Sequence, residues 1–260
     1  MSLAPQPAIA TRLEKLAADN GFDRPMGSSN GWLAFASTQA PLGLWLSALA
    51  DAVFLAAFSR ADVARALDEL GTPWAAPLPE GAAAGRSTVS LAQLHQLVRR
   101  AFQLARALPD EPLRAFERQT AGLPRTTEVE RLVVQRIGQD IFRARLMEYW
   151  EERCAVTGLA VPELLRASHI KPWADCESDA ERLDVFNGFL LAPNLDAAFD
   201  RGLLTFRDDG EALLSPLLDT SAREALAFRE PLRLRRLVDG HLPFLRWHRE
   251  KVFRTKSKEQ

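Results

Sequence analysis

Short apolar runs alternate with polar breaks along the first third of the chain. Runs at residues 32–36, 42–49 and 53–58 are separated by Gly, Pro, Gln and Asp. Runs of this length between turn-forming residues predict β-strands, although a short apolar run can also be a buried helix. Residues 12–20 have the spacing of a short amphipathic helix, and residues 71–87, rich in Pro, Gly and Ala, predict a loop.

Helix starts are marked where a hydroxyl residue is followed three positions later by an acidic or amide residue. The pairs are Ser59 with Asp62, Ser90 with Gln93, and Thr127 with Glu130. They predict helices over residues 60–70, from 90 to about 108, and from 127 to about 150. Residues 109–126 contain three prolines and predict a connection between domains.

The composition is that of an ordinary globular protein. The chain has 260 residues, enough for one large or two ordinary domains, and is 47% hydrophobic and 26% charged. These values exclude a wholly disordered, collagen-like or coiled-coil protein, and the net charge of −1 excludes a uniformly basic nucleic-acid coat. Residues 228–260, however, carry ten Lys/Arg against four Asp/Glu. This basic end predicts a contact with a polyanion, or a solvated helical end.

We expect a cytoplasmic protein that does not cross a membrane. Two cysteines, Cys154 and Cys176, are too few for a disulfide framework or a four-cysteine zinc site, and they fit a reducing cytosol. The first residues turn charged before an apolar segment develops, so no signal peptide is predicted. Residues 40–58 approach membrane-spanning length, but the charge of Asp51 lies in their middle, so a buried hairpin or helix is predicted instead.

Residues 164–191 predict a β-hairpin with a histidine on it. Residues 164–170 have strand character and include His169, and a second apolar run occupies residues 189–191. Asn187 followed by Gly188 is typical of a tight turn. A helix is predicted to follow this hairpin from residue 193.

The predicted helix carries two carboxylates, Asp196 and Asp200, which share one face because they are four residues apart. Together with His169 they suit phosphodiester hydrolysis. An imidazole can deprotonate water near neutral pH, and a divalent ion places positive charge on the phosphate and the leaving oxygen. Two carboxylates favour Mg²⁺ or Mn²⁺ without excluding Zn²⁺.

The order and spacing of four motifs resemble the HNH, or ββα-metal, endonuclease superfamily. The motifs are C-x-x-T-G from Cys154, S-H-I-x-P-W from Ser168, N-G-x-L-L from Asn187 and L-D-x-x-F-D from Leu195. The resemblance covers residues 125–206. It implies an α+β protein in which a small mixed domain, residues 1–120, precedes an HNH nuclease domain, residues 121–260, with a helical lead-in and a basic tail.

The resemblance implies a role for each matching residue. His169 matches the general base, and Asn187 matches the central asparagine that pins the hairpin and orients that base. Asp196 matches a metal-ligand position, and Asp200 matches a second helix ligand. The alternatives are a structural histidine at residue 169, a simple turn at residue 187, and pairing of Asp200 with Arg201.

Two departures from the family pattern bear on metals. Ser168 stands where many HNH sites have an Asp or His ligand. Thr157 and Leu195 stand where other members have zinc-binding cysteines, so no structural zinc is expected.

Four residues are candidates for DNA binding. Arg136, Gln139 and Arg143 share one side of the helix predicted over residues 127–150. They either contact phosphates or form a solvated helix face. Lys171, close to His169 in the sequence, is the fourth candidate.

The expected function is that of a metal-dependent endonuclease acting on double-stranded DNA, with a restriction or defence role suggested by analogy. The alternative is a non-catalytic DNA-binding or interaction protein on a decayed HNH fold, which the departure at Ser168 favours. Residues 1–120 are expected either to select the target, with Trp32 and Trp45 shaping a pocket for a base, or to mediate homodimer formation or partner binding.

Overall fold

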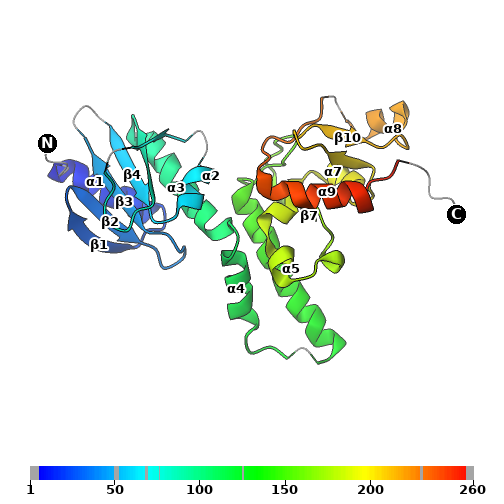
Figure 1. The fold of residues 1–260 in the computed structure, drawn as a ribbon, viewed down its shortest axis with the longest axis horizontal. Helices are drawn as coiled ribbons and strands as arrows, with labels where there is room; N and C mark the ends of the chain where they lie inside the picture. The colour runs from blue at the N-terminus through cyan, green and yellow to red at the C-terminus, as the bar shows by residue number, and fades with distance from the viewer. Residues whose placement is uncertain are drawn as a thin grey trace. The chain divides into compact units, whose positions relative to one another are not determined.

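The computed structural model describes residues 6–49, 53–67, 70–75, 77–124, 126–228 and 231–255. The chain forms two compact units, Met1–Leu108 and Pro109–Gln260. Each unit combines helices with antiparallel strands, so the protein has an α+β fold (Figure 1). This division differs from the expected boundary near residue 120, because Glu111–Thr120, expected to lie in a connection, form helix α4, which packs against helix α5 of unit 2. Pro112 is accommodated in the first turn of α4, where no backbone N–H is needed.

The described residues of unit 1 form a six-stranded antiparallel sheet with three helices. The strand order is β1-β2-β3-β4-β6-β5. The strands are β1 (Arg24–Ser29), β2 (Trp32–Ala36), β3 (Leu44–Ala48), β4 (Phe54–Phe58), β5 (Thr72–Pro73) and β6 (Ala84–Thr88). The helices are α1 (Pro7–Asp19), α2 (Ala61–Ala66) and α3 (Leu91–Ala107). The three strands and three helices predicted for this part of the chain are thereby confirmed, β2 with the predicted ends and the others with shifted ends. Residues 68 and 69 of the helix predicted over residues 60–70 lie outside the described residues.

Two local predictions in unit 1 are wrong. The segment expected to be a loop contains β5 and most of β6. Strand β6 pairs with β4 and β5 although its residues lack an apolar alternation. The hydroxyl of Ser59 does not cap α2 but accepts a hydrogen bond from the backbone N–H of Gly43 at 2.8 Å. Ser90, in contrast, caps α3 as predicted, because its hydroxyl accepts the N–H of Gln93 at 3.2 Å.

Both faces of the sheet contribute to the core of unit 1. Leu44 and Leu46 are fully buried on β3, which contacts α1. Trp32 packs with Leu55 and Ala57 in a second cluster and is only 3% exposed. The ring of Trp32 therefore stabilises the core and has no free face on which a base could stack, whereas Trp45 is partly exposed beside the same cluster.

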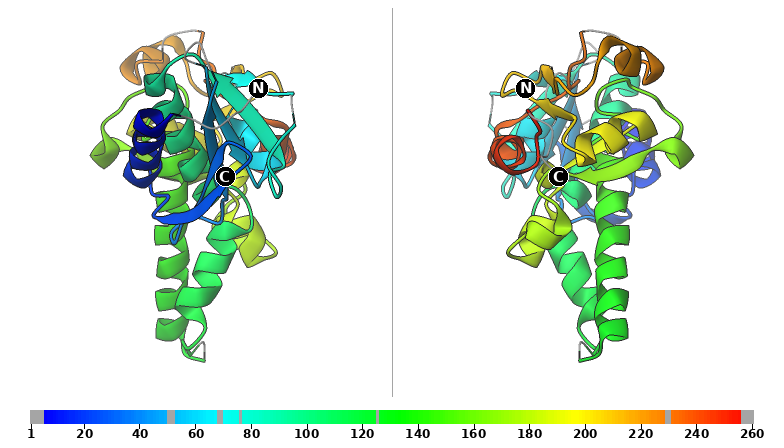
Figure 2. Two further views of the ribbon diagram at one scale, coloured as in Figure 1. Left: turned by 90° about the vertical axis from the view of Figure 1, so that its left-hand side faces the viewer. Right: turned by 90° about the vertical axis from the view of Figure 1, so that its right-hand side faces the viewer.

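Unit 2 is built around a two-stranded hairpin between helices. Its helices are α4 (Glu111–Thr120), α5 (Glu128–Tyr149), α6 (Asp179–Leu183), α7 (Pro193–Asp200), α8 (Thr220–Ala225) and α9 (Leu242–Lys251). Its strands are β7 (Arg166–His169), β8 (Gly188–Leu191), β9 (Leu204–Phe206) and β10 (Ala212–Leu214), joined in the pairs β7–β8 and β9–β10. Helices α4 and α5 run side by side in both views of Figure 2. Short 3₁₀ turns lie at Pro162–Leu164, Trp173–Asp175, Val185–Asn187 and Asp239–His241.

Helix α5 supports the hairpin. It begins with the predicted capping box, in which the Thr127 hydroxyl and the Glu130 carboxylate each accept a backbone N–H of the other residue. Gly188 starts β8 where α5 passes closely, since a Cβ at this position would lie 2.5 Å from the Phe142 ring. The tight turn predicted at residues 187–188 is wrong. The strands are joined by residues 170–187, and Asn187 ends a 3₁₀ turn.

Within the basic end of the chain, Leu242–Lys251 form α9, which packs against β9. His248 is 1% exposed and stacks on Phe199, with 4.0 Å between ring centroids. Its Nδ1 lies 2.9 Å from the hydroxyl of Thr205. The described part of the predicted tail is thus a packed part of unit 2, whereas Lys256 and Lys258 lie outside the described residues.

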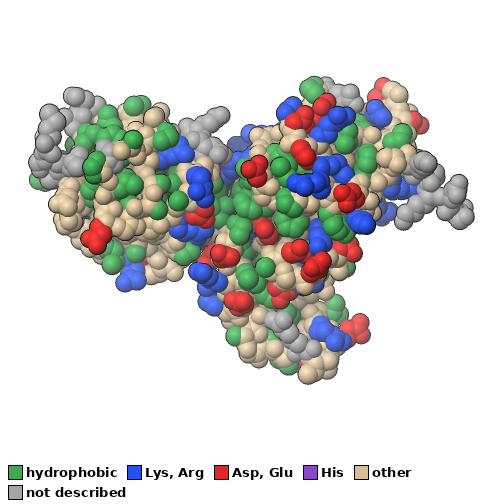
Figure 3. Space-filling model, in the orientation of Figure 1, with side chains coloured by type: hydrophobic (Ala, Val, Ile, Leu, Met, Phe, Trp, Pro, Cys, Tyr) green, Lys and Arg blue, Asp and Glu red, His purple; other side chains and the backbone are tan. Residues whose placement is uncertain are grey.

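The surface of unit 2 carries charges of both signs. Over the face of this unit that Figure 3 shows, Lys and Arg side chains lie beside Asp and Glu side chains. Arg249 on α9 also forms an ion pair with Asp208, with 2.6 Å between nitrogen and oxygen. The positive charge of the C-terminal segment is therefore partly balanced by acidic residues of the same unit, and its contact with a polyanion stays a prediction.

In the described part of the chain, no helix combines the length and apolar character required to cross a membrane. Asp51, on which the sequence argument against a membrane span rests, lies outside the described residues.

Candidate functional site

The end of β7 faces helix α7 through Ser168. This residue is 2% exposed, and its hydroxyl donates to a carboxylate oxygen of Asp200 at 3.1 Å. The same hydroxyl favours the charged form of Asp196, one helical turn earlier. Antiparallel pairing of β7 with β8 fixes Ser168 opposite Phe189, so the strand register places this hydroxyl against α7. The two predicted carboxylates are therefore brought close to each other, and Ser168 is hydrogen-bonded to the second of them.

Both carboxylates have pKa values above the ordinary value for aspartate. Partial loss of solvation is the main cause for Asp196 and for Asp200. The negative charge of Asp196 raises the pKa of Asp200 further, while Arg201 acts against this shift. Two crowded, partly desolvated carboxylates repel each other, and a bound cation would relieve that repulsion.

His169 is held as a neutral imidazole. Its Nε2 lies 2.9 Å from the backbone carbonyl oxygen of Arg182. Because a carbonyl oxygen can only accept, Nε2 carries the hydrogen and Nδ1 keeps an unshared electron pair. The ring stacks on Phe142 at 3.7 Å and meets Trp173 edge-on at 5.7 Å. Burial lowers the pKa of His169 to about 4, so the ring is uncharged at neutral pH.

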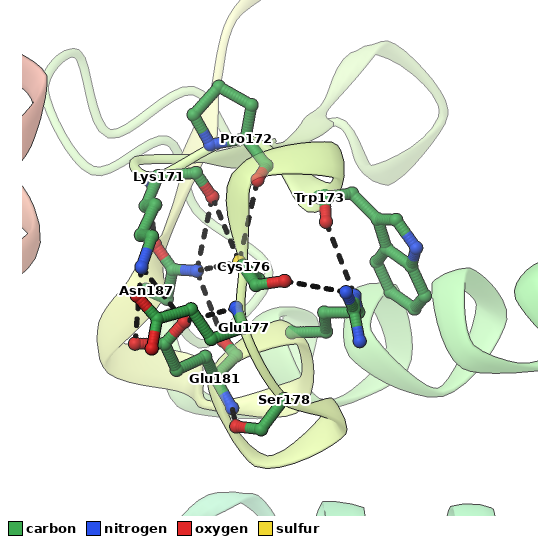
Figure 4. A network of polar contacts seen from close by, with 9 residues as sticks. Lys171, Pro172, Trp173, Cys176, Glu177, Ser178, Glu181 and Asn187 are labelled. Atoms are coloured by element: carbon green, nitrogen blue, oxygen red, sulfur yellow. Dashed lines mark hydrogen bonds and ion pairs between the residues drawn. The ribbon is translucent and has the colours of Figure 1, made fainter. Parts of the chain in front are cut away.

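Asn187 ties together the connection between the two strands (Figure 4). It is fully buried, and its Oδ1 accepts the backbone N–H of Lys171 at 2.8 Å. Its Nδ2 donates to the carbonyl oxygens of Lys171 and Glu181, at 3.2 and 3.0 Å, and lies 3.4 Å from the Sγ of Cys176. The side chain thus joins the end of β7 to α6, the helix that carries the carbonyl oxygen bonded to His169. Its predicted role in orienting the base stays a prediction.

Arg182 is a residue that the sequence argument missed. Besides its backbone contact with His169, its guanidinium donates to the carbonyl oxygens of Trp173 and Cys176, at 3.2 and 2.6 Å. It also forms an ion pair with Asp179 at 3.0 Å and lies over the Trp173 ring, 5.8 Å from its centroid. These contacts hold the backbone that orients the histidine. No motif marks this arginine, and the only signal is a lone basic residue in an acidic helix.

The four residues predicted to bind DNA fall into two groups. Arg136 and Gln139 are exposed on α5. Arg143 is half-buried, and its guanidinium donates to two backbone carbonyl oxygens of the turn at Pro162–Leu165, at 2.8 and 3.1 Å. Lys171 is 8% exposed, and its ammonium pairs with a carboxylate of α6 at 3.0 Å. Two of the four candidates therefore already have partners, and DNA binding by all four stays a prediction.

The donor set suits a hard cation with an incomplete protein shell. Among the described residues, no group of three or more His, Cys, Asp or Glu side chains is placed to hold a metal ion. The site offers the carboxylates of Asp196 and Asp200 and the hydroxyl of Ser168. Oxygen donors of this kind fit Mg²⁺ or Mn²⁺, which retain bound water molecules.

Both cysteines are buried and unpaired with each other. The Sγ of Cys154 accepts the backbone N–H of Ala192 at 3.3 Å, which ties the C-x-x-T-G turn to the start of α7. The Sγ of Cys176 contacts Asn187. The thiols thus have structural contacts, and the expected lack of a structural zinc stays a prediction.

Comparisons with known proteins bear on the same segment. No curated protein matches the chain. One solved structure that matches is a "Modification dependent TagI restriction endonuclease", at 24% identity and a TM-score of 0.30. The match covers 42% of this chain and 36% of that protein's chain. Residues 154–207, which include the hairpin and α7, match the family model described as "HNH endonuclease". This match supports placing the segment in the HNH endonuclease superfamily.

Proposed function

We propose that the protein is a metal-dependent endonuclease that hydrolyses phosphodiester bonds of double-stranded DNA. The observation that carries the proposal is the pairing of two features at the end of β7. His169 is a neutral imidazole with an unprotonated Nδ1. The preceding residue, Ser168, donates a hydrogen bond to Asp200, whose pKa is raised by the nearby charge of Asp196. The family match of residues 154–207 supports the same function.

His169 acts as the general base in this proposal. Its Nδ1 takes a proton from the attacking water, and the carbonyl oxygen of Arg182 stabilises the resulting imidazolium through Nε2–H. A pKa of about 4 makes the free ring a weak base, but the negative charge of a bound phosphate raises it toward the working range. Phe142 and Trp173 fix the plane of the ring, so Nδ1 keeps one direction.

Asp196, Asp200 and Ser168 would hold the divalent ion. When bound, that ion supplies positive charge to the scissile phosphate and to the leaving oxygen. The raised pKa values of the two aspartates make ion binding depend on pH, because protons compete with the ion as pH falls. Mg²⁺ or Mn²⁺ is the ion we propose.

The second candidate is a non-catalytic DNA-binding protein on the same fold. One observation favours it: a serine occupies the position next to His169 where a third ligand is expected, and its hydroxyl is hydrogen-bonded to Asp200. Loss of a ligand could abolish metal binding while leaving the fold intact.

We extend the proposal to the biological role and to unit 1. A restriction or defence role follows by analogy with the superfamily, and two free buried cysteines fit a reducing cytoplasm. We also propose that unit 1 selects the target, because contacts to phosphates position a nuclease but carry little sequence information. Partner binding or homodimer formation is the other proposal for unit 1.

Nicking of supercoiled plasmid separates the two candidate functions. The wild-type protein is expected to nick in Mg²⁺ or Mn²⁺ and to be inactive in EDTA. His169→Ala is expected to lose roughly 10²–10⁴ in rate, the usual contribution of a general base. His95→Ala, an exposed histidine of unit 1, is the matched control and should cleave normally. Cleavage by the folded His169→Ala protein at the wild-type rate would remove His169 from the mechanism, and no cleavage by the wild type would favour the binding protein.

A further inference from the structure

A cavity of about 200 Å³ lies at the C-terminal end of α5. Its lining includes Tyr149, Trp150, Glu151, Arg153, Arg235 and Arg236, and none of the candidate active-site residues belongs to it. Three arginines against one glutamate make the lining positive. A positive cavity with aromatic walls is suited to an anion, since low-dielectric walls strengthen the attraction.

The backbone after α5 brings Arg153 to this cavity. Glu151 and Glu152 both adopt the left-handed conformation, with φ of 53° and 54°, in the turn that follows α5. The N–H of Arg153 then donates to the carbonyl oxygen of Trp150 at 3.0 Å. Two successive non-glycine residues with positive φ are uncommon, so tertiary packing must fix this turn.

Arg235 reaches the cavity from a distant part of the sequence. Its N–H donates to the carbonyl oxygen of Ala155 at 2.8 Å, which docks its backbone on the C-x-x-T-G turn. Its Nη1 lies 2.9 Å from the position that a Cβ on Gly158 would take, and Gly158 has φ of +73°. Glycine at this position therefore serves the turn and also leaves room for the arginine side chain.

The three arginines of the cavity differ in their contacts and in their exposure to solvent. Arg236 lies over the Tyr149 ring, 5.7 Å from its centroid, and is half-buried. Arg153 and Arg235 are exposed, and within the described residues neither guanidinium takes part in a hydrogen bond or an ion pair. Planar guanidinium groups bind phosphate through two parallel N–H donors.

We propose that this cavity is a phosphate-binding site in which Arg153 and Arg235 are the ligands and Arg236 forms part of the wall. The phosphate has two sources, the backbone of bound DNA or a free phosphate or nucleotide. Binding of a DNA phosphate rests on the proposed function. In that case the cavity would bind the DNA backbone at a point away from the candidate active site.

The test compares wild-type protein with the double variant Arg153→Gln/Arg235→Gln. Arg207→Gln is the matched control, because Arg207 is exposed in unit 2 and does not line the cavity. All proteins carry intact active-site residues and are measured in EDTA. Thermal unfolding and circular dichroism verify that each variant folds. The first arm measures binding of a short DNA duplex at several salt concentrations, and the second measures the shift in Tm that inorganic phosphate causes at fixed ionic strength against chloride.

If the site takes DNA phosphate, the double variant binds the duplex on the order of tenfold more weakly. The slope of log K against log salt then falls by about 0.9 for each DNA phosphate that the variant no longer neutralises. If the site takes free phosphate, the wild type and Arg207→Gln gain Tm in phosphate and the double variant does not. Unchanged DNA affinity, unchanged slope and equal phosphate shifts in all three proteins would overturn the proposal. A wild type that binds DNA but never cleaves it would refute the nuclease proposal alone.

Discussion

The hydroxyl of Ser168, at the end of β7, donates to the carboxylate of Asp200, at the end of α7, across 3.1 Å. The serine is almost completely buried, so this hydroxyl has little access to water. In the proposed metal site it stands where a third carboxylate would join Asp196 and Asp200 as a ligand. The affinity of the site for a divalent ion is therefore expected to be limited by residue 168.

Ser168→Asp should tighten Mn²⁺ binding by on the order of tenfold or more, because a third carboxylate adds negative charge and an oxygen ligand. The same variant should be less stable without metal, since three carboxylates would share a partly desolvated site. Isothermal titration calorimetry gives the affinity, and urea unfolding in EDTA gives the stability. Ser28→Asp, an exposed serine of unit 1, controls for added charge. The double variant Asp196→Ala/Asp200→Ala should lose binding, and unchanged affinity in it would move the ion elsewhere.

The hairpin and helix of the candidate site could be predicted because they are local. The apolar runs, the capping box at Thr127 and the carboxylate spacing on α7 each depend on a few neighbouring residues. Strand β6 could not be predicted in this way, because it is stabilised by pairing with β4 and β5 and not by its own apolar pattern. The Asn-Gly pair at residues 187–188 led to a wrong prediction of a tight turn for a similar reason. The side chain of Asn187 makes its hydrogen bonds with residues 6 to 16 positions away, and none of them closes a two-residue turn.

The contact partners of individual side chains could not be predicted from the sequence. Arg143 has the spacing of a phosphate-binding row, yet its guanidinium binds the turn before β7. Arg182 lies in no motif, yet its carbonyl oxygen sets the tautomer of His169. Such roles depend on which segments meet in the fold, and a single sequence does not contain that information.

Unit 1 should determine which DNA is cut. The structure divides the chain after Leu108, so the fragment to test is residues 109–260 and not one that begins at residue 121 and loses α4. This fragment is expected to cleave with the full-length metal requirement but with reduced selectivity, since contacts to phosphates carry little sequence information. Cleavage of a panel of modified and unmodified DNAs measures selectivity, and light scattering measures the oligomeric state. A folded fragment with full selectivity would contradict target reading by unit 1. A change from dimer to monomer would favour an assembly role.

Arg182 should act on catalysis through His169. Arg182→Met removes three anchoring hydrogen bonds and should loosen the backbone that bears the carbonyl oxygen bonded to Nε2. We expect kcat to fall by roughly 10–100-fold with little change in KM, since misplacement of a base affects the transition state.

The acid limb of the pH–rate profile should move, because the imidazolium loses a fixed acceptor. Arg182→Lys, which can keep one hydrogen bond, should recover part of the rate. Arg131→Met, at an exposed position on α5, is the control. Equal loss in kcat and in stability with an unmoved pH profile would indicate a purely structural role.

Asp184 should make the stability of unit 2 depend on pH. Its carboxylate accepts the N–H of Phe186 at 2.8 Å and so caps the 3₁₀ turn that ends at Asn187. Burial raises its pKa from 3.8 to about 6. The folded state therefore binds a proton more tightly than the unfolded state, and this contribution to stability is fully present below pH 3.8 and is lost as pH rises through about 6.

Asp184→Asn keeps the oxygen that accepts the N–H of Phe186 and removes the charge. At pH 8 the variant should exceed the wild type in free energy of unfolding by about 1–3 kcal/mol, the upper value being the full pKa shift. At pH 4.5 this excess should fall to about a third of its value at pH 8, because about two thirds of the Asp184 contribution is still present there. His169, His241 and His248 all have pKa values lowered to about 4 by burial, so acid destabilises both proteins alike, and the difference between them isolates Asp184. Urea unfolding at pH 4.5, 6 and 8 measures this difference, with the exposed Asp175→Asn as control. A difference that stays constant across this range would show that the Asp184 carboxyl does not titrate as its burial predicts.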